Sequence, residues 1–161
     1  MNGIDEQNLP GLFDPSYNKD GHQRIELFLS CRGLPNKDFL SKSDPQVQLY
    51  LEDGPEMKLL GQTEVIRDNL NPDFATTITI DYKFEVRQVL IFKVIDVDKN
   101  EKFDTLGEVR TTCGDIMGSR NQLSILDITD NGTQAGKLIV RAEVVSLNAG
   151  IVRFKIKANN L

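Results

Sequence analysis

Five aspartates gather in two short segments of this sequence, 37–45 and 96–104. A hard cation such as Ca²⁺ takes about six to eight oxygen ligands, and five carboxylates would supply most of that shell. Without a cation, the same carboxylates would repel one another. The pattern therefore predicts a calcium site shared by the two segments. Its ligands would be Asp38, Asp44, Asp96, Asp98 and Asp104.

An EF-hand loop is one alternative for the second segment. Asp96, Asp98 and Asn100 match the start of such a loop. However, Glu101 stands at the sixth position, where glycine is required, and Gly107 stands at the twelfth, where a bidentate glutamate is required. The flanking segments also have the pattern of strands, so the EF-hand is excluded. A plainer alternative is that aspartate is common in turns because it forms local hydrogen bonds, which accounts for any one of the five better than for all of them.

The segments that must hold these loops have the pattern of β-strands. Apolar and polar residues alternate in most of them, and one is almost continuously apolar, as in a central strand. They are 24–31, 47–51, 76–80, 89–95 and 138–144. Turn residues separate them, and about eight short strands with such punctuation indicate an antiparallel β-sandwich. Helical turns are expected only at 81–88 and 113–118.

The composition is that of one globular domain. The chain has 161 residues, 27% charged and 39% hydrophobic, which excludes a disordered protein. No apolar run approaches the ~18–20 residues of a membrane-spanning helix, and the first residues lack the features of a secretory signal. We therefore expect a cytoplasmic protein in which Cys31 and Cys113 are free, buried thiols.

The net charge of −5 disfavours nucleic acid as a partner, because such proteins present a basic face. Taking away the five negative charges of the aspartates would leave a net charge of zero, so the acidity belongs to one predicted site. Nothing favours catalysis either. His22 is the only histidine, and the sequence has no pattern of a nucleophilic triad or of a phosphate-binding loop. We expect a binding protein rather than an enzyme.

The order and spacing of the motifs resemble those of the C2 domain family over residues 24–146. The motifs are Gly33-Leu34-Pro35, Asp38, Ser43-Asp44-Pro45, Asn71-Pro72-Asp73-Phe74, Asp96-Val97-Asp98, Asp104 and Leu106-Gly107. Within that family the chain is similar to the first C2 domain of a copine. This similarity rests on Ser30-Cys31-Arg32-Gly33-Leu34, Leu40-Ser41-Lys42-Ser43-Asp44-Pro45, Thr63-Glu64-Val65-Ile66-Arg67 and Ala135-Gly136-Lys137. The resemblance implies an eight-stranded antiparallel β-sandwich of the Greek-key type.

The resemblance also implies the site. Asp38 and Asp44 match the ligands of the first binding loop, and Asp96, Asp98 and Asp104 match those of the third. The backbone carbonyls of Lys37 and Val97 are further candidate calcium ligands. Residues at the loop tips would contact the membrane, the apolar ones by insertion and the lysines through lipid phosphate. They are Phe39, Leu40, Lys42, Lys99, Asn100, Lys102 and Phe103. The alternative is that Phe39 or Phe103 folds back into the core and that the lysines are only solvated.

The function that the resemblance implies is calcium-dependent binding to phospholipid. Such a module would recruit its parent protein to anionic membranes in signalling or membrane trafficking, moving from the cytoplasm to the cytoplasmic face of membranes when calcium rises. The alternative is a protein-binding scaffold in which calcium is structural or regulatory. A hydrolase with a regulatory domain of this kind also stays open.

The expected domain organisation has three parts. Residues 1–21 would be a flexible leader, and 22–147 the C2 domain. Residues 148–161 would be a linker and the first strand of a second, truncated C2 domain, because 152–161 repeats the pattern of 25–34.

Overall fold

The structure is a computed structural model that describes residues 21–37 and 41–145. Within these residues the chain forms eight β-strands, one short α-helix and one turn of 3-10 helix. They are β1 (His22–Arg32), β2 (Pro45–Asp53), β3 (Glu56–Gln62), β4 (Ile78–Lys83), β5 (Val89–Val97), β6 (Phe103–Thr112), α1 (Cys113–Gly118), η2 (Arg120–Gln122), β7 (Leu123–Asp130) and β8 (Thr133–Val144).

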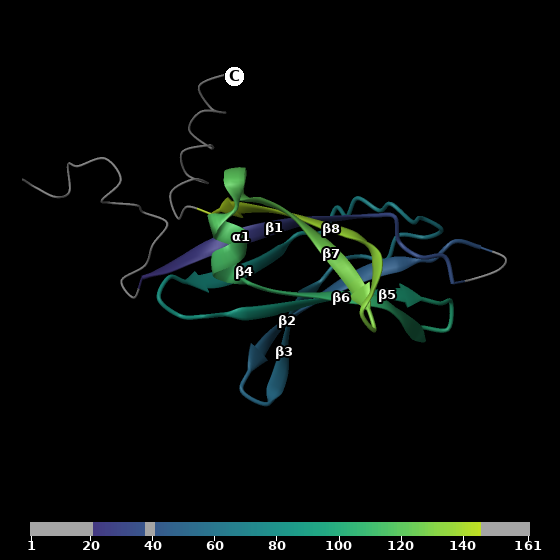
Figure 1. Cartoon of the computed structure of the whole chain (residues 1–161), viewed down its shortest axis with the longest axis horizontal. Helices are drawn as coiled ribbons and strands as arrows, with labels where there is room; N and C mark the ends of the chain where they lie inside the picture. The colour runs from purple at the N-terminus through teal and green to yellow at the C-terminus, as the bar shows by residue number, and fades with distance from the viewer. Residues whose placement is uncertain (1–20, 38–40, 146–161) are drawn as a thin grey trace, which may run out of the picture.

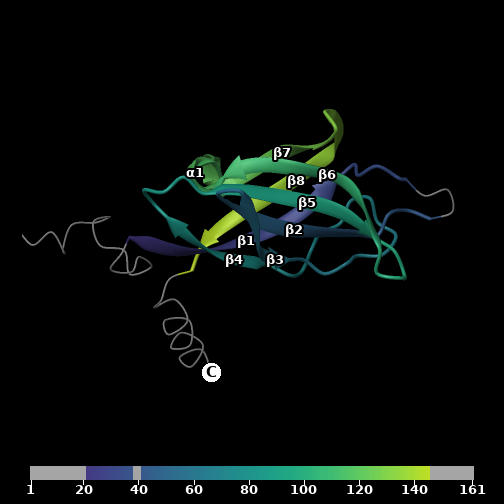
Figure 2. The same cartoon turned by 90° about the horizontal axis from the view of Figure 1, so that it is seen from below.

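The strands form two antiparallel layers. Their hydrogen-bonded order is β3-β2-β5-β6-β7-β8-β1-β4, and every pairing is antiparallel. Between β6 and β7 the pairing is reduced to Glu108 and Thr129, so the chain folds over there into two four-stranded sheets. The result is a β-sandwich (Figures 1 and 2). The predicted fold class, eight antiparallel strands in a sandwich, is confirmed.

The core follows the predicted alternation. In β1, every second side chain from Ile25 to Cys31 is buried, and β8 buries Leu138, Val140 and Ala142 in the same way. β5 is buried on both faces, as predicted for a central strand. Each fully buried aliphatic or aromatic side chain contributes about 1.5–3 kcal/mol relative to exposure. Because the side chains of a strand alternate between its faces, burying one face fixes the register of the whole strand.

Strand register also brings the two acidic segments to one end of the sandwich. Pro45, the first residue of β2, pairs with Asp96 near the end of β5. On the other side of β5, Asp96 pairs with Asp104 near the start of β6. This loop end lies at the right of Figure 1, and α1 lies toward the opposite end in both views.

One expected helix is present and the other is not. The helix at 113–118 is confirmed as α1, and the Thr112 hydroxyl caps it by accepting a hydrogen bond from the amide of Asp115. The helical turn expected at 81–88 is wrong. β4 continues to Lys83, and the buried side chain of Gln88 bonds to the backbone of Asp81 and Lys83, which holds a tight turn in place of a helix.

Both cysteines are free and buried, as predicted. No helix in the described part of the chain has the length and apolar composition needed to cross a membrane. Apart from Gly21, the expected leader lies outside the described residues, as does the expected linker and strand at 148–161.

Candidate functional site

The two acidic segments are hydrogen-bonded to each other directly. The amide of Asp44 donates to Oδ1 of Asp96 at 2.8 Å, and the amide of Val97 donates to the carbonyl of Asp44 at 3.0 Å. Asp96 is buried and its carboxylate is held between the two strands, whereas Asp44 is half-buried at the rim. The start of β2 and the end of β5 therefore bring the predicted first and third binding loops together.

Asp98 organises the third loop. Its Oδ1 accepts hydrogen bonds from the amides of Asn100 at 2.8 Å and Lys102 at 3.0 Å. Its own amide donates to the carbonyl of Lys102 at 2.8 Å. Glu101 lies in the left-handed region, with φ of 64°, which closes the turn between β5 and β6. The loop is thus folded around the Asp98 carboxylate.

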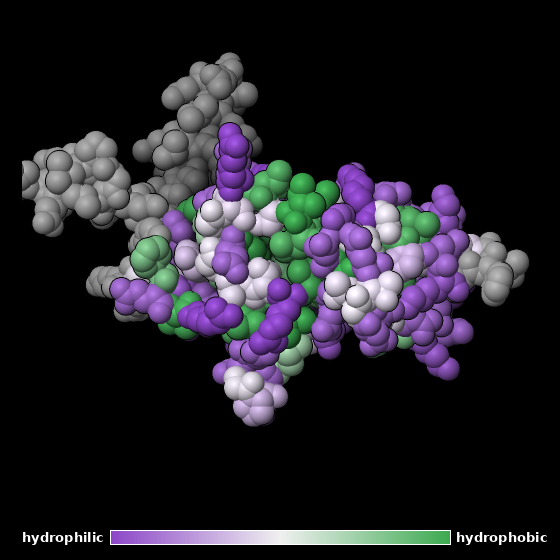
Figure 3. All heavy atoms as spheres, viewed as in Figure 1, coloured by the Kyte–Doolittle hydropathy of each residue, from purple (hydrophilic) through white to green (hydrophobic). Residues whose placement is uncertain are grey.

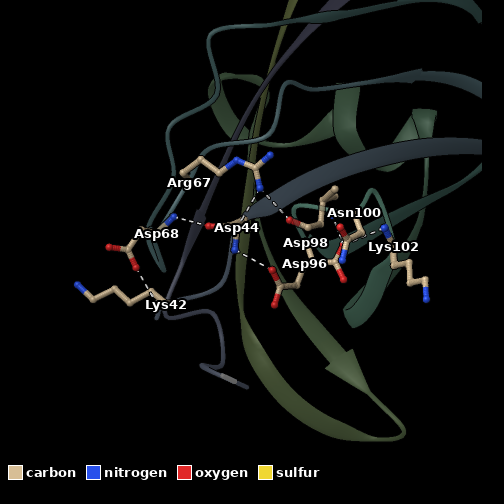
Figure 4. A network of polar contacts seen from close by, with 9 residues as sticks. Lys42, Asp44, Arg67, Asp68, Asp96, Asp98, Asn100 and Lys102 are labelled. Carbon is tan, nitrogen blue, oxygen red and sulfur yellow. Dashed lines mark hydrogen bonds and ion pairs between the residues drawn. The ribbon is translucent and has the colours of Figure 1, made fainter. Parts of the chain in front are cut away.

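The loop between β3 and β4, residues 63–77, completes this end of the molecule. The amide of Asp68 donates to Oδ1 of Asp44 at 2.6 Å, and the Asp68 carboxylate accepts from the amide of Lys42 at 2.8 Å. Arg67 places Nη1 at 3.1 Å from Oδ2 of Asp44 and at 3.1 Å from the carbonyl oxygen of Val97 (Figure 4). The Arg67 guanidinium thus bridges the predicted first and third binding loops, which contain Asp44 and Val97.

Arg67 and Asp68 were not predicted as site residues. The run that ends at Arg67 carried part of the family resemblance, but nothing in the sequence places it against Asp44, 23 positions away. The available signal is indirect. An arginine in a loop between two strands, in a chain whose acidity is concentrated in one site, is a candidate counter-ion for that site.

The residues present fit calcium in their chemistry and backbone positions. The predicted ligands among the described residues are hard oxygen donors, the kind that calcium takes. They are the carboxylates of Asp44, Asp96, Asp98 and Asp104 and the backbone carbonyls of Lys37 and Val97. Register sets Asp96 beside Asp104, at the short spacing of paired strands. Among the described residues, however, no three acidic, histidine or cysteine side chains are grouped closely enough to hold a metal.

The reason is visible in the side-chain directions. The Asp44 carboxylate faces the Arg67 guanidinium and the Asp68 amide, and Oδ1 of Asp98 faces the amides of its own loop (Figure 4). Bringing these carboxylates onto one ion requires rotation of side chains on a backbone already in register. Asp38 lies outside the described residues, so the full ligand set stays a prediction.

The predicted membrane contacts that the structure describes are all exposed at this end. Phe103 is 58% exposed, so the alternative that it folds back into the core is wrong. Lys42, Lys99, Asn100 and Lys102 are exposed as well. Phe39 and Leu40 lie outside the described residues.

Lys37 has a structural contact that the sequence did not reveal. Its amino group donates to the carbonyl of Thr105 at 2.7 Å and to the carboxylate of Asp130 at 3.1 Å. The side chain therefore ties the first loop to β6 and to the end of β7. The role predicted for its own carbonyl as a calcium ligand stays a prediction.

Comparison with known sequences gives a consistent result. The family model described as "C2 domain" matches residues 25–127. Copine-A of Dictyostelium discoideum is 38% identical over 135 residues, which cover 83% of this chain and 22% of the relative. Copine-E of the same organism is 37% identical over 145 residues, covering 86% of this chain and 25% of the relative. The chain thus spans about a quarter of the length of these curated relatives.

Solved structures agree on the fold. The C2-A domain of a plant Extended Synaptotagmin 1 has a TM-score of 0.64 and is 23% identical. The match covers 78% of this chain and 95% of that chain. A calcium-bound structure of the C2-A and C2-B domains of Extended-Synaptotagmin 2 has a TM-score of 0.60 and is 25% identical. The match covers 85% of this chain and 52% of that chain.

Proposed function

This chain belongs to the C2 domain family, and from that premise we propose that it is a copine-like module that binds phospholipid in a calcium-dependent way. Its task would be to recruit its parent protein from the cytoplasm to the cytoplasmic face of anionic membranes, in signalling or membrane trafficking. The observation that carries the proposal is the pairing of Asp44 with Asp96, which joins two acidic loops at one end of the sandwich. We propose no catalytic activity.

The acidic end repels anionic lipid as long as its charge is uncompensated. Strand pairing brings Asp44, Asp96, Asp98 and Asp104 to one end of the sandwich, in a chain of net charge −5. Two bound Ca²⁺ ions would bring the net charge from −5 to −1 and would offer open coordination positions to phosphate oxygens of the lipid. The protein's part is to hold the carboxylates together and to present the surrounding loops.

The loop tips supply the contacts that would follow. Phe103 is an exposed aromatic side chain beside the predicted ligand Asp104, which suits it to enter the headgroup layer. Lys99 and Lys102 are exposed in the same loop and would contact lipid phosphate. The right end of Figure 3, where these loops lie, is mostly hydrophilic, so an apolar tip there is surrounded by charge.

A protein-binding scaffold is the second candidate, and one observation favours it. Leu123 and Ile125 of β7 are exposed, Ile125 by 64%, away from the loop end. Apolar side chains also gather over β7 and β8 in the middle of the face shown in Figure 3. On this alternative, calcium would stabilise or regulate the domain, and the outer face of the sheet would bind a protein.

Sedimentation with liposomes separates the two candidates. The protein is spun with vesicles of phosphatidylcholine alone or with about a quarter phosphatidylserine, in calcium or in EGTA. We expect it to pellet only with the anionic vesicles and only in calcium. Equal sedimentation in calcium and EGTA, or none in either, would favour the scaffold.

A further inference from the structure

The backbone on both sides of Arg67 is fixed to the predicted first binding loop. The amide of Ile66 donates to the carbonyl of Pro45 at 3.0 Å, and the amide of Asn69 donates to the carbonyl of Ser43 at 3.0 Å. Between them, the amide of Asp68 donates to the Asp44 carboxylate at 2.6 Å. Asp68 itself has a φ of 53°, so the chain turns sharply there. Arg67 therefore projects from an anchored turn.

The guanidinium reaches two oxygens that are both predicted calcium ligands. Nη1 lies 3.1 Å from Oδ2 of Asp44 and 3.1 Å from the carbonyl oxygen of Val97. These oxygens come from the first and third binding loops, the two that would have to share an ion. A calcium ion would lie about 2.3–2.6 Å from each oxygen. The guanidinium and the ion would then be separated by only a few ångströms and would repel each other.

Lysines near these loops have different contacts. The amino group of Lys37 is directed to Thr105 and Asp130. Lys42 and Lys102 take part in the network of Figure 4 through their backbone amides. The ion pair of Arg67 with Asp44, by contrast, places a cationic side chain directly on a predicted carboxylate ligand.

We propose that Arg67 is a built-in counter-cation, which occupies the predicted calcium site when calcium is absent and so raises the calcium concentration at which the site fills. The inference rests on the proposed calcium-dependent function. The Arg67 side chain is 55% exposed, so the contact is of the weak, solvent-screened kind that a divalent ion displaces. The free energy of that displacement is subtracted from the affinity for calcium, as for any ligand that must shift an equilibrium before binding.

The test compares Arg67→Gln with the matched control Arg110→Gln. Both variants lose one positive charge, but Arg110 pairs with Glu52 near the other end of β2, away from the loops. Calcium affinity is measured by calorimetry without lipid. We expect Arg67→Gln to bind calcium about three- to tenfold more tightly than the wild type, and Arg110→Gln to bind like the wild type. Arg67→Lys keeps the charge and should stay closer to the wild type than Arg67→Gln.

The second readout is thermal unfolding in EGTA and in saturating calcium. Without Arg67 the carboxylates lose their compensating charge, so the rise in melting temperature on adding calcium should be larger for Arg67→Gln than for the wild type or for Arg110→Gln. An unchanged affinity and an unchanged calcium-dependent rise in Arg67→Gln would overturn the inference.

Failure of the inference and failure of the proposed function give different results. If the wild type binds calcium and Arg67→Gln binds it equally well, only the inference fails. If neither protein binds calcium, the proposed function fails and the inference fails with it. If Arg67→Gln binds calcium and the wild type does not, the inference that Arg67 opposes calcium binding is confirmed. The proposed calcium-dependent function of the wild type then fails.

Discussion

The amide of Asp44 donates a hydrogen bond to Oδ1 of Asp96, 52 positions further along the chain and 2.8 Å away in space. This bond forms between the residue before β2 and the penultimate residue of β5, so it depends on the register of the whole strand pair. A shift of that register would separate the two acidic loops. The pairing of β2 with β5 thus brings two acidic segments that are distant in the sequence together in one site.

Asp98→Asn should abolish calcium-dependent binding to anionic liposomes and leave the domain folded. Asparagine keeps a side-chain oxygen that can accept from the amides of Asn100 and Lys102, so the third loop retains its turn. It loses the negative charge of the carboxylate, and the affinity of a calcium site falls with the number of charged ligands. Circular dichroism and liposome sedimentation check the two halves of this prediction. Calcium-dependent sedimentation equal to that of the wild type would remove Asp98 from the ligand set.

Gly136→Ala should destabilise the domain by about 2–4 kcal/mol. Gly136 has a φ of 101°, and a Cβ built there would lie 2.6 Å from the carbonyl oxygen of Arg32 and 2.8 Å from that of Gly33. Backbone atoms cannot move away as a flexible side chain can. Gly118→Ala is the control, since a Cβ there would meet nothing within 4 Å. Urea unfolding measures both, and equal stabilities of the two variants would contradict the prediction.

The contribution of Glu64 to the stability of the domain should be lost in acid. Burial alone would raise the pKa of Glu64, but the hydrogen bonds from the amides of Ala75 and Thr76 outweigh it, so the pKa lies below its ordinary value of 4.5. A carboxyl whose pKa is lowered by folding stabilises the fold above its unfolded pKa, and this stabilisation is lost as the pH falls through the folded pKa.

The Glu64→Gln variant isolates this effect. The difference in unfolding free energy between the wild type and Glu64→Gln should shrink as the pH is lowered from about 6 to about 3. Glu85→Gln, which removes a carboxylate from an exposed turn, serves as the control for the loss of one negative charge. A difference that is constant over this range would contradict the assignment.

The two cysteines should be unreactive in the folded protein. Burial raises the pKa of Cys31 to about 12 and that of Cys113 to about 12, so the reactive thiolate is scarce at neutral pH. A thiol reagent added to the native protein should label neither residue within minutes, and both should react once the protein is unfolded in guanidinium chloride. Rapid labelling of the native protein would show that the core opens more easily than its packing indicates.

The sequence predicted the strands whose two faces differ in burial. β1 has a buried face of Ile25, Leu27, Leu29 and Cys31, and this alternation is directly visible in the residue types. β3 could not be recognised in the same way, because most of its residues are exposed on both faces. In β7 the alternation misleads, since Ser124 is buried while Leu123 and Ile125 are exposed. Such strands are defined by their partners, which a single sequence does not reveal.

The candidate site divides along the same line. The aspartates could be recognised from their type and spacing, because calcium requires oxygen ligands and carboxylates supply them. Arg67 could not be assigned, because its contacts to Asp44 and Val97 exist only after β2, β5 and the loop between β3 and β4 have packed. The helical turn expected at 81–88 is wrong for a related reason, since the Gln88 side chain bonds to the backbone of Asp81 and Lys83 in a way that residue propensities do not encode.

The central claim is that calcium switches this domain onto anionic phospholipid. One titration tests it most directly. The fraction of protein bound to vesicles containing phosphatidylserine is followed as free calcium is raised, and EGTA is then added to the same sample. The account predicts a saturable rise in binding with calcium, complete release by EGTA, and no rise with vesicles of phosphatidylcholine alone. Binding that does not depend on calcium, or no binding at millimolar calcium, would contradict it.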